Sequence, residues 1–483
     1  MENPNYRAEI RRAYADMAAA PADPWRPAYH LTPPAGTLGD PNGLCQVGDT
    51  YHIFDVTSPL SCRTTARTPC VWGHFTTKDF IRYTLQPIAI YPDDRRDRDG
   101  VYSGSALVRD GRLYLYYTGN VRHHGDFDYI HAGREQNVLR VESTDGIHFD
   151  NKTLLMTNED FPADLTNHVR DPQILPLEGG GLRMLLGART LEDVGCALVY
   201  ESVDGTHFRL ANRLQTAEPF GYMWECPDLA VVDGQPLFIC CPQGIPHEEY
   251  CYQNAHQCGC FPVEGDIAKD AVLGEFQQFD FGFDLYAART LKAKDGRVLL
   301  FAWMGMSETS YNRNPCADRG WDQVIAMPRE LHWRDGRLYQ QPIPELAALR
   351  GSRQVRDPAA GCQWQGRRCE LVLAPAAGQD VAVHLYEDAV LCYRAGEGVL
   401  ELEMGPVCGG PRGVRRMKLD TLTKMDIYLD GSTMEVFLND GYAAMTSRIF
   451  GESTTISVDG FAGKAEFYDM HGFSMADARE NGV

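Results

Sequence analysis

A tight turn that contains glycine, followed by an apolar or aromatic segment, recurs five times along the chain. The copies are VGDTYHIFDV (from Val47), RDGRLYLYYTG (from Arg109), EGGGLRMLLGA (from Glu178), VDGQPLFICCPQG (from Val232) and KDGRVLLFAWMG (from Lys294). Their marker glycines, at positions 48, 111, 181, 234 and 296, are spaced by 63, 70, 53 and 62 residues. About 60 residues hold four short strands with their loops, which is the size of one propeller blade. The repeat therefore predicts a five-bladed β-propeller over residues 28–345, with a coincidence of hairpins in an ordinary β-sandwich as the alternative.

The segments on either side of the repeat have different patterns. Residues 1–27 include an Ala- and Arg-rich stretch that predicts an N-terminal helical extension. Residues 353–483 read as alternating strands, and within them DIYLDGSTMEVFLNDGYAAMTSRIF carries two turns, at Asp430-Gly431 and Asn439-Asp440-Gly441. We therefore expect an all-β fold in which the propeller is followed by a C-terminal β-sandwich domain.

Polar residues head the segment that precedes each marked turn by 8 to 12 residues. These heads are Asp40-Pro41-Asn42-Gly43, Tyr102-Ser103-Gly104-Ser105, Arg170-Asp171-Pro172, Glu225-Cys226-Pro227 and Phe283-Asp284-Leu285-Tyr286. If each segment is the innermost strand of its blade, its head lies at one end of the central channel. The repeat thus predicts that acidic side chains far apart in sequence converge on one pocket.

Composition and charge narrow the possible partners. The formal net charge is 46 − 66 = −20, which disfavours nucleic acid and anionic membranes because both are bound through basic surfaces. The charged start of the chain lacks the apolar core of a secretory signal, and no run of 18 apolar residues occurs. Fifteen cysteines, an odd number, are then most simply reduced thiols of a cytoplasmic protein. None of these patterns predicts an oligomeric state.

Two or three carboxylates in one pocket suit glycoside hydrolysis, with a small-molecule saccharide as substrate and no cofactor. The adjacent Arg170 is expected to keep Asp171 ionised, whereas Trp224 and Cys226 around Glu225 favour a raised pKa and a role as proton donor. The backbone N–H groups of the turn after Asp40 could fix a nucleophilic carboxylate. Taken alone, each motif also has an ordinary reading, as a turn or as a structural ion pair.

Several motifs in order resemble one enzyme family. They are Tyr29-His30-Leu31-Thr32-Pro33-Pro34, Gly39-Asp40-Pro41-Asn42-Gly43-Leu44, Trp72-Gly73-His74, Tyr102-Ser103-Gly104-Ser105-Ala106, Val169-Arg170-Asp171-Pro172 and Trp224-Glu225-Cys226-Pro227-Asp228. Together they resemble the invertase family of glycoside hydrolases (family 32), and most of all its intracellular bacterial sucrose-6-phosphate hydrolase branch. The resemblance covers about residues 24–345 and continues into 426–450. It implies a propeller plus sandwich and a retaining β-fructofuranosidase, with Asp40 as nucleophile, Glu225 as general acid/base and Asp171 as transition-state stabiliser.

Three sugar-contacting positions and one nearby segment depart from that family. Its Trp and Asn before Asp-Pro-Asn-Gly are Thr37 and Gly39 here, a Gln that contacts fructose is Val56, and no aromatic residue occurs in Leu60–Thr65. Lost polar contacts weaken discrimination between sugars. We therefore expect a working hydrolase whose preferred fructoside is larger or substituted, and three alternatives stay open: a fructosyltransferase, a furanosidase for another sugar, and a non-catalytic carbohydrate-binding relative.

The predicted substrate-binding residues are Asn42, Trp72, Tyr102, Ser103, Arg170, Tyr286 and Trp303. The four aromatic residues among them could form a floor for a sugar face or belong to the propeller core.

Other conspicuous residues have ordinary interpretations. Arg63 and Arg67 are read as surface charge, with an anionic substituent such as phosphate as the alternative ligand. His123-His124 and the Asp93–Asp99 run read as solvated loop. We expect reduced thiols rather than a metal site in the Cys/His-rich stretch, which contains Cys240, Cys241, His247, Cys251, His256, Cys258 and Cys260, because its spacing is not that of a zinc site.

Overall fold

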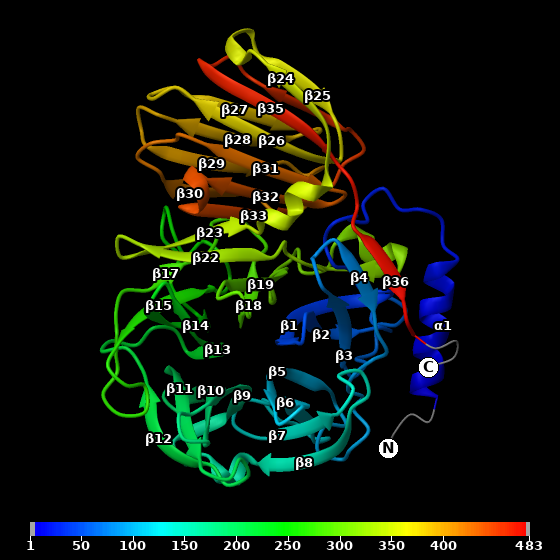
Figure 1. Cartoon of the computed structure of the whole chain (residues 1–483), viewed down its shortest axis with the longest axis vertical. Coiled ribbons are helices and arrows are strands. Elements are labelled where there is room, and N and C mark those ends of the chain that lie inside the picture. The colour runs from blue at the N-terminus through cyan, green and yellow to red at the C-terminus, as the bar shows by residue number, and fades with distance from the viewer. Residues whose placement is uncertain (1–4, 480–483) are drawn as a thin grey trace.

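The computed structural model describes residues 5–479. Residues 1–4 of the predicted extension and 480–483 of the predicted sandwich domain lie outside the described residues. Figure 1 shows a lower body of sheets around a common centre, an upper body of two sheets packed face to face, and helix α1 (Tyr6–Ala18) along one side. The prediction of a mostly-β fold is confirmed. Within residues 5–479, no helix is both long enough and apolar enough to cross a bilayer.

Five successive sheets make up the lower body within the described residues. The first contains β1 (Gly36–Val47), β2 (Thr50–Ser58), β3 (Val71–Thr77) and β4 (Arg82–Leu85). The second contains β5 (Val101–Arg109), β6 (Arg112–Arg122), β7 (Arg134–Ser143) and β8 (Asp150–Met156). The third contains β9 (Leu165–Pro176), β10 (Leu182–Thr190), β11 (Gly195–Ser202) and β12 (Arg209–Leu214).

The remaining two sheets continue the same order along the chain. The fourth contains β13 (Met223–Val232), β14 (Gln235–Gln243), β15 (Gly259–Glu264), β16 (Val272–Leu273) and β17 (Gln277–Gln278). The fifth contains β18 (Tyr286–Lys292), β19 (Val298–Met304), β21 (Val324–Ile325), β22 (Arg329–Arg334) and β23 (Arg337–Pro342). The short strand β20 (Trp321–Asp322) pairs in parallel with β1 and so joins the last part of the ring to the first sheet.

The first strand of every sheet is irregular at its polar head. Antiparallel pairing is interrupted between Leu38 and Pro41 in β1, between Tyr102 and Gly104 in β5, and at the corresponding point opposite Gly187 in β9. The same break follows Glu225 in β13 and Tyr286 in β18. A β-bulge bends its strand and re-aims the side chains beside it. The repeated bulge therefore turns the polar heads out of the sheets and toward the centre of the ring.

The predicted apolar segments are the second strands of these sheets. In β10, β14 and β19 almost every residue is buried, because neighbouring sheets cover both faces. Two turns that echo each other in sequence also have the same hydrogen bonds. Ser143 and Ser202 each accept from the glycine N–H three residues later and donate to the aspartate two residues later.

Two six-stranded sheets form the upper body. One contains β24 (Arg350–Arg356), β26 (Arg368–Pro375), β31 (Met425–Asp430), β32 (Thr433–Leu438), β33 (Ala443–Arg448) and β35 (Gly463–Met470). The other contains β25 (Cys362–Gln365), β27 (Val381–Leu385), β28 (Ala389–Arg394), β29 (Val399–Met404), β30 (Val414–Lys418) and β34 (Thr455–Val458). The last strand, β36 (Ser474–Asp477), departs from the predicted division, because it leaves the upper body and pairs in parallel with β4. The short 3-10 turns are η1 (Asn158–Asp160), η2 (Pro315–Arg319), η3 (Pro344–Leu349), η4 (Pro358–Ala360) and η5 (Asn439–Gly441).

A buried charge network joins the two bodies. Arg329 of β22 is 1% exposed and donates to Glu435 Oε2 of β32 at 2.7 Å and to Asp280 Oδ2 at 3.3 Å. Glu435 Oε1 accepts from Met327 N and contacts His30 Nε2 at 3.1 Å. Asp280 Oδ1 accepts from the backbone N–H of Gly282 and of Thr446. Every oxygen of these two carboxylates is therefore hydrogen-bonded within the protein.

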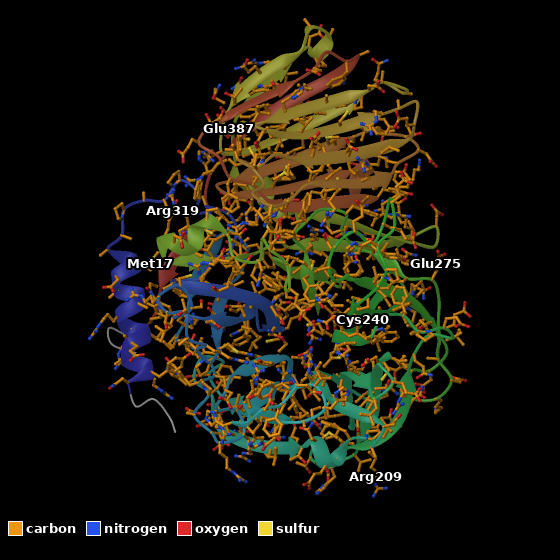
Figure 2. The ribbon with its side chains drawn as sticks, turned by 180° about the vertical axis from the view of Figure 1, so that it is seen from behind. Met17, Arg209, Cys240, Glu275, Arg319 and Glu387 are labelled. Carbon is orange, nitrogen blue, oxygen red and sulfur yellow. The ribbon has the colours of Figure 1, made fainter. Side chains whose placement is uncertain are left out.

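Helix α1 packs against the first sheet through its apolar side. Ile10 and Ala13 are buried there, and Met17 lies beside Arg319 (Figure 2), where a side chain at the neighbouring Gly320 would collide with it. Asp55 of β2 is 2% exposed, its Oδ1 has no hydrogen bond, and its charge acts on Tyr14 of the helix. Burial raises the pKa of Asp55 to about 7. This carboxyl group is thus an isolated buried acid outside the polar heads.

Candidate active site

Three carboxylates from different sheets meet at the polar heads. Asp40 comes from β1, Asp171 from β9 and Glu225 from β13. Each lies close enough to influence its neighbours, since the charges of Asp171 and Glu225 both raise the pKa of Asp40. The convergence expected from the sequence repeat is therefore present in the structure.

Asp40 is held through only one of its carboxylate oxygens. Its Oδ2 accepts a hydrogen bond from Ser103 Oγ of β5 and lies 3.9 Å from the Cys226 thiol. Its Oδ1 accepts no hydrogen bond from residues 5–479, and the expected backbone N–H groups of the following turn do not reach the carboxylate. Burial raises the pKa of Asp40 to about 7, opposed by the Ser103 hydrogen bond and reinforced by the two neighbouring carboxylates.

Glu225 is surrounded by hydrogen-bond donors. Its Oε1 accepts from Arg170 Nη2 at 2.6 Å, and its Oε2 accepts from Tyr286 OH at 2.6 Å and from Gln243 Nε2 at 2.8 Å. Burial by itself raises the pKa of Glu225, but the Arg170 charge and these hydrogen bonds outweigh it, so that the pKa lies below its usual value. The raised pKa expected from Trp224 and Cys226 is therefore wrong, because donors from other sheets dominate.

Asp171 differs from the sequence expectation in its partner. The side chain of the adjacent Arg170 turns to Glu225, and its Nε stays 3.9 Å from Asp171 Oδ2. Asp171 Oδ2 instead accepts from the Cys226 backbone N–H at 2.9 Å. Burial raises the pKa of Asp171, although the charges of Arg170 and Arg289 lower it. The charge of Arg170 thus favours the ionised form of Asp171, but burial outweighs it, so that the pKa of Asp171 lies above its usual value.

Arg170, Glu225 and Tyr286 occupy the same position in three consecutive sheets. Each stands just before the break in pairing, and each is followed by a residue in the left-handed region: Asp171 (φ 66°), Cys226 (φ 52°) and Ala287 (φ 52°). Non-glycine residues adopt this conformation at a cost and concentrate at functional sites. The repeated strain brings the three side chains together, so that Glu225 lies between its two donors.

The predicted binding residues divide into two groups. Ser103, Tyr286 and Arg170 bond the carboxylates, and Tyr102 lies close enough to Arg170 to act on its pKa. Trp303 (8% exposed) has an indole N–H without a partner and packs edge-on to Tyr286. Asn42 and Trp72 are fully buried. Asn42 donates to the Asp40 carbonyl and accepts from Gly104 N, while the Trp72 indole donates to the Tyr102 carbonyl. These last two brace the heads of β1 and β5 and belong to the core.

Several polar residues of the site were missed by the sequence reasoning. Gln243 is the next-to-last residue of the fourth repeated segment and bonds Glu225. Arg289 of β18 donates to the Asp171 carbonyl at 3.3 Å. Asn120 and Gln136, paired across β6 and β7, are fully buried, and each has an amide atom without a hydrogen bond. His256 is 4% exposed, and its charge lowers the pKa of Glu225. Only Gln243 stood within a repeated motif that could have identified it.

The departures from the family pattern are neighbours in space. Gly39 faces Val56, since a Cβ at Gly39 would stand 3.3 Å from the Val56 carbonyl oxygen. Thr37 bonds Ser61 and pairs with Asp322 in the ring closure. Next to that pair, Gln323 adopts φ 66°, is 1% exposed and has an unpartnered Oε1. The altered positions therefore lie next to one another at the start of β1, just before Asp40 in the chain, and at the end of β2.

The structure also shows where the other conspicuous residues of the sequence lie. Arg63 pairs with Asp16 of α1 at 2.8 Å, while Arg67 donates to the Tyr102 hydroxyl at 2.6 Å. The Asp93–Asp99 run is not wholly solvated, because Asp97 is fully buried against Lys152 and Tyr117. His123 pairs with Glu135 at the surface. The thiols of Cys240, Cys241, Cys258 and Cys260 are free and buried (Cys240 is labelled in Figure 2), and no three metal-ligating side chains within residues 5–479 are grouped to hold an ion.

Two family models, several relatives and several solved structures are similar to this chain. Residues 30–342 match the glycosyl hydrolases family 32 N-terminal domain, and residues 401–473 match the family 32 C-terminal domain. A sucrose-6-phosphate hydrolase from Bacillus subtilis is 34% identical, covering 91% of this chain and 93% of the relative. A raffinose invertase from Escherichia coli is 33% identical, covering 91% and 93%. The solved sucrose-6-phosphate hydrolase from Lactobacillus gasseri has a TM-score of 0.86 and 29% identity, covering 96% of this chain and 97% of that one.

Proposed function

The chain belongs to glycosyl hydrolases family 32 and is a hydrolase of the β-fructofuranosidase type, and on this premise we propose that Asp40, Glu225 and Asp171 carry out the reaction. The observation that carries the proposal is the convergence of these three carboxylates from β1, β9 and β13, where their charges act on one another. A pocket of this kind supports retaining hydrolysis of a β-fructofuranoside in two displacements.

The first displacement uses Asp40 and Glu225. Asp40 Oδ1, which has no hydrogen bond from residues 5–479, attacks the anomeric carbon of fructose. The bond from that carbon to the leaving oxygen breaks, its electron pair moves to the oxygen, and the oxygen takes the proton of Glu225. The products of this step are the free aglycone, a fructosyl ester on Asp40 and an ionised Glu225.

The second displacement reverses these roles. Ionised Glu225 removes a proton from water, the water oxygen attacks the anomeric carbon, and the ester bond to Asp40 breaks. Fructose leaves, Asp40 regains its charge and Glu225 regains its proton. Asp171 turns its unbonded Oδ1 toward the sugar hydroxyls, where hydrogen bonds that strengthen in the transition state speed both steps.

Before a substrate binds, the proton shared by Asp40 and Glu225 is held mainly by Asp40. Because the pKa of Asp40 is about 7 and that of Glu225 lies below its usual value, a singly protonated pair holds its proton mainly on Asp40. The reactive arrangement, with Glu225 protonated and Asp40 ionised, is the minor form of the same singly protonated pair. We therefore expect a bell-shaped dependence of kcat/KM on pH, with its alkaline limb near the pKa of Asp40.

The five sheets of residues 36–342 are proposed to be the five blades of a propeller. Support comes from their equal place in the chain repeat, from the bulge shared by their first strands and from their arrangement around one centre (Figure 1). The division into an extension over 1–27, a catalytic domain over 28–345 and a sandwich over 353–483 follows from it, with β36 as a strand that returns to the first blade.

We also place the protein in the cytoplasm. All fifteen cysteines are free, and the sulfur atoms of Cys241 and Cys258 stand 3.4 Å apart as thiols. Closely spaced thiols remain reduced in a reducing compartment.

A substrate panel followed by NMR tests the function. Sucrose, sucrose 6-phosphate, raffinose and short fructans are incubated with the enzyme, and the anomer of fructose formed first is recorded. Release of β-fructofuranose before mutarotation is expected. Initial release of the inverted anomer, or no fructose from any substrate, would overturn the proposal.

A further inference from the structure

Four arginines form a continuous basic group beside the carboxylates. Arg170 lies against Glu225, Arg134 begins β7, Arg122 ends β6, and Arg67 comes from the loop between β2 and β3. Arg122 and Arg134 stand directly opposite each other in the β6–β7 ladder. Burial and the charges of Arg170, Arg122 and Arg67 together lower the pKa of Arg134 to about 10. The like charges are therefore close enough to repel one another.

Three of these arginines have no acidic partner within residues 5–479. Arg67 bonds the Tyr102 hydroxyl, Arg122 stacks on the Tyr129 ring at 3.8 Å, and Arg134 meets only His168. The chain carries 66 acidic and 46 basic side chains, so acidic partners are abundant elsewhere on it. Like charges opposite each other in a sheet are destabilising. A group of unpaired arginines in such an acidic protein is a feature that a bound anion would explain.

The contact between Arg134 and His168 does not satisfy the arginine. The pKa of His168 is lowered to about 2 by burial and by the charges of Arg170 and Arg134, so its ring is neutral and has one acceptor nitrogen. Nδ1 accepts from Arg170 at 2.7 Å, and Nε2 therefore carries the hydrogen that points to the Tyr129 carbonyl at 3.1 Å. Arg134 finds no acceptor on this ring, and its buried Nε also lacks a partner. Its guanidinium donors remain available to a ligand.

The position of the group points to the leaving part of the substrate. Glu225 protonates the leaving oxygen, and from Glu225 the contacts lead through Arg170, which is 7% exposed, and His168 to the partly exposed Arg134 and the exposed Arg67. The basic group thus runs from the proton donor toward the surface of the protein. A phosphate monoester offers two negative charges and several acceptor oxygens, which match the forked donors of guanidinium groups.

We propose that Arg134, Arg122 and Arg67, with the Tyr102 hydroxyl, bind a phosphate monoester carried by the sugar that leaves. The inference rests on the proposed function and deepens it, because it assigns an anion subsite next to the acid/base. Of the two arginines for which the sequence left a phosphate ligand open, Arg67 belongs to the subsite. Arg63 lies outside it, because it pairs with Asp16.

The test compares a phosphorylated with an unphosphorylated substrate in matched variants. For the wild type, Arg134→Gln, Arg67→Gln and the double variant, kcat/KM is measured on sucrose 6-phosphate and on sucrose. Arg63→Gln is the control, because it removes a charge from the same loop outside the subsite. Circular dichroism melting establishes that each variant is folded.

The expected result is a change in the ratio of the two kcat/KM values. The wild type prefers sucrose 6-phosphate, Arg134→Gln lowers this preference about tenfold or more, and the double variant lowers it further. Arg63→Gln changes it less than about threefold. Folded variants that cleave both substrates with the wild-type ratio would overturn the subsite while leaving the hydrolase function intact.

A binding arm separates failure of the subsite from failure of the proposed function. Isothermal titration measures glucose 6-phosphate, glucose and inorganic phosphate against the wild type and Arg134→Gln. Tighter binding of glucose 6-phosphate than of glucose, lost in Arg134→Gln, supports the subsite even if no fructoside is cleaved. Equal binding of the two sugars by the wild type contradicts it, and binding of inorganic phosphate that Arg134→Gln leaves unchanged also contradicts it.

Discussion

Two groups of buried charges in this molecule differ in how completely their oxygens are bonded. Between the two bodies, Glu435 and Asp280 accept hydrogen bonds on both carboxylate oxygens, and both meet Arg329. In the pocket, Asp40 and Asp171 each leave Oδ1 without a hydrogen bond from residues 5–479. The first group is fully bonded within the protein, whereas the second leaves two carboxylate oxygens without a hydrogen bond from residues 5–479.

The difference shows what each group contributes. A fully bonded buried ion pair fixes how elements pack, and removal of one partner leaves an uncompensated charge. A carboxylate with a free oxygen has bonding capacity in reserve, which a reacting sugar can use in the transition state. Damage to the first group should therefore appear in stability, and damage to the second in turnover.

The largest effect is expected at the nucleophile. Asp40→Asn keeps the shape of the side chain and the contact with Ser103 but removes the attacking charge, so kcat should fall about 10⁴-fold or more. The melting temperature should stay near or above that of the wild type, because a buried carboxyl group is replaced by a neutral one. Steady-state release of fructose and a thermal melt measure both. Substantial residual turnover would contradict the assignment.

Loss of Arg329 should lower the stability of the protein rather than its turnover. Arg329→Met removes the guanidinium that Glu435 and Asp280 share and leaves Asp280 buried without a cation, and we expect the free energy of unfolding to fall by about 3–5 kcal/mol. Urea denaturation followed by tryptophan fluorescence measures the loss. Arg353→Met is the matched control, because Arg353 pairs with Glu466 at an exposed site where an ion pair contributes less than about 1 kcal/mol. Equal losses in the two variants would remove the contrast.

Asp55 also has a carboxylate oxygen without a hydrogen bond, but it lies outside the proposed active site. Since burial raises its pKa from 3.8 to about 7, the folded state binds the proton more tightly than the unfolded state. Its contribution to stability is therefore present at low pH and is lost as the pH rises through 7. Asp55→Asn removes this loss, so its stability relative to the wild type should increase by up to about 3 kcal/mol between pH 5 and pH 8. Urea denaturation at both pH values measures this difference, and a constant difference would show that Asp55 does not titrate as described.

The smallest effect concerns the proton shared by Asp40 and Glu225. Ser103→Ala removes a hydrogen bond that lowers the pKa of Asp40, so the alkaline limb of the kcat/KM profile should move to higher pH by about one unit. Ser105→Ala serves as the control, because the Ser105 hydroxyl accepts only from the Ile174 backbone N–H. A shift of the acidic limb instead would place the lower pKa on Asp40 and reverse the proton assignment.

Much of this arrangement could be read from the sequence. The repeat predicted the successive sheets and aligned Asp40, Asp171 and Glu225 at their heads, because residues at one offset of a structural repeat share one position. The same repeat aligned Tyr286 less well, because the polar head of the fifth segment was taken to begin at Phe283, three residues before Tyr286. The bulge that makes Tyr286 equivalent to Glu225 leaves no composition signal at that offset.

The charge pairing could not be read from the sequence. Arg170 and Asp171 are adjacent, but successive residues of a strand point in different directions, and Arg170 reaches the equivalent position of the next sheet instead. The pKa of Glu225 follows from that contact and from Tyr286 and Gln243, which come from other strands. Likewise, burial of Asn42 and Trp72 depends on neighbouring sheets. Chain order predicts which residues share a level of the ring, and packing decides which of them meet.

Trapping of the covalent intermediate shows directly whether Asp40 is the nucleophile. In Glu225→Gln, β-fructosyl fluoride needs no acid to lose its leaving group, but the second displacement lacks its base, so the fructosyl-enzyme should accumulate. Rapid quenching, digestion and mass spectrometry then locate the adduct. We expect one fructosyl group esterified to Asp40. An adduct on another residue, or turnover with no adduct at any time, would contradict it.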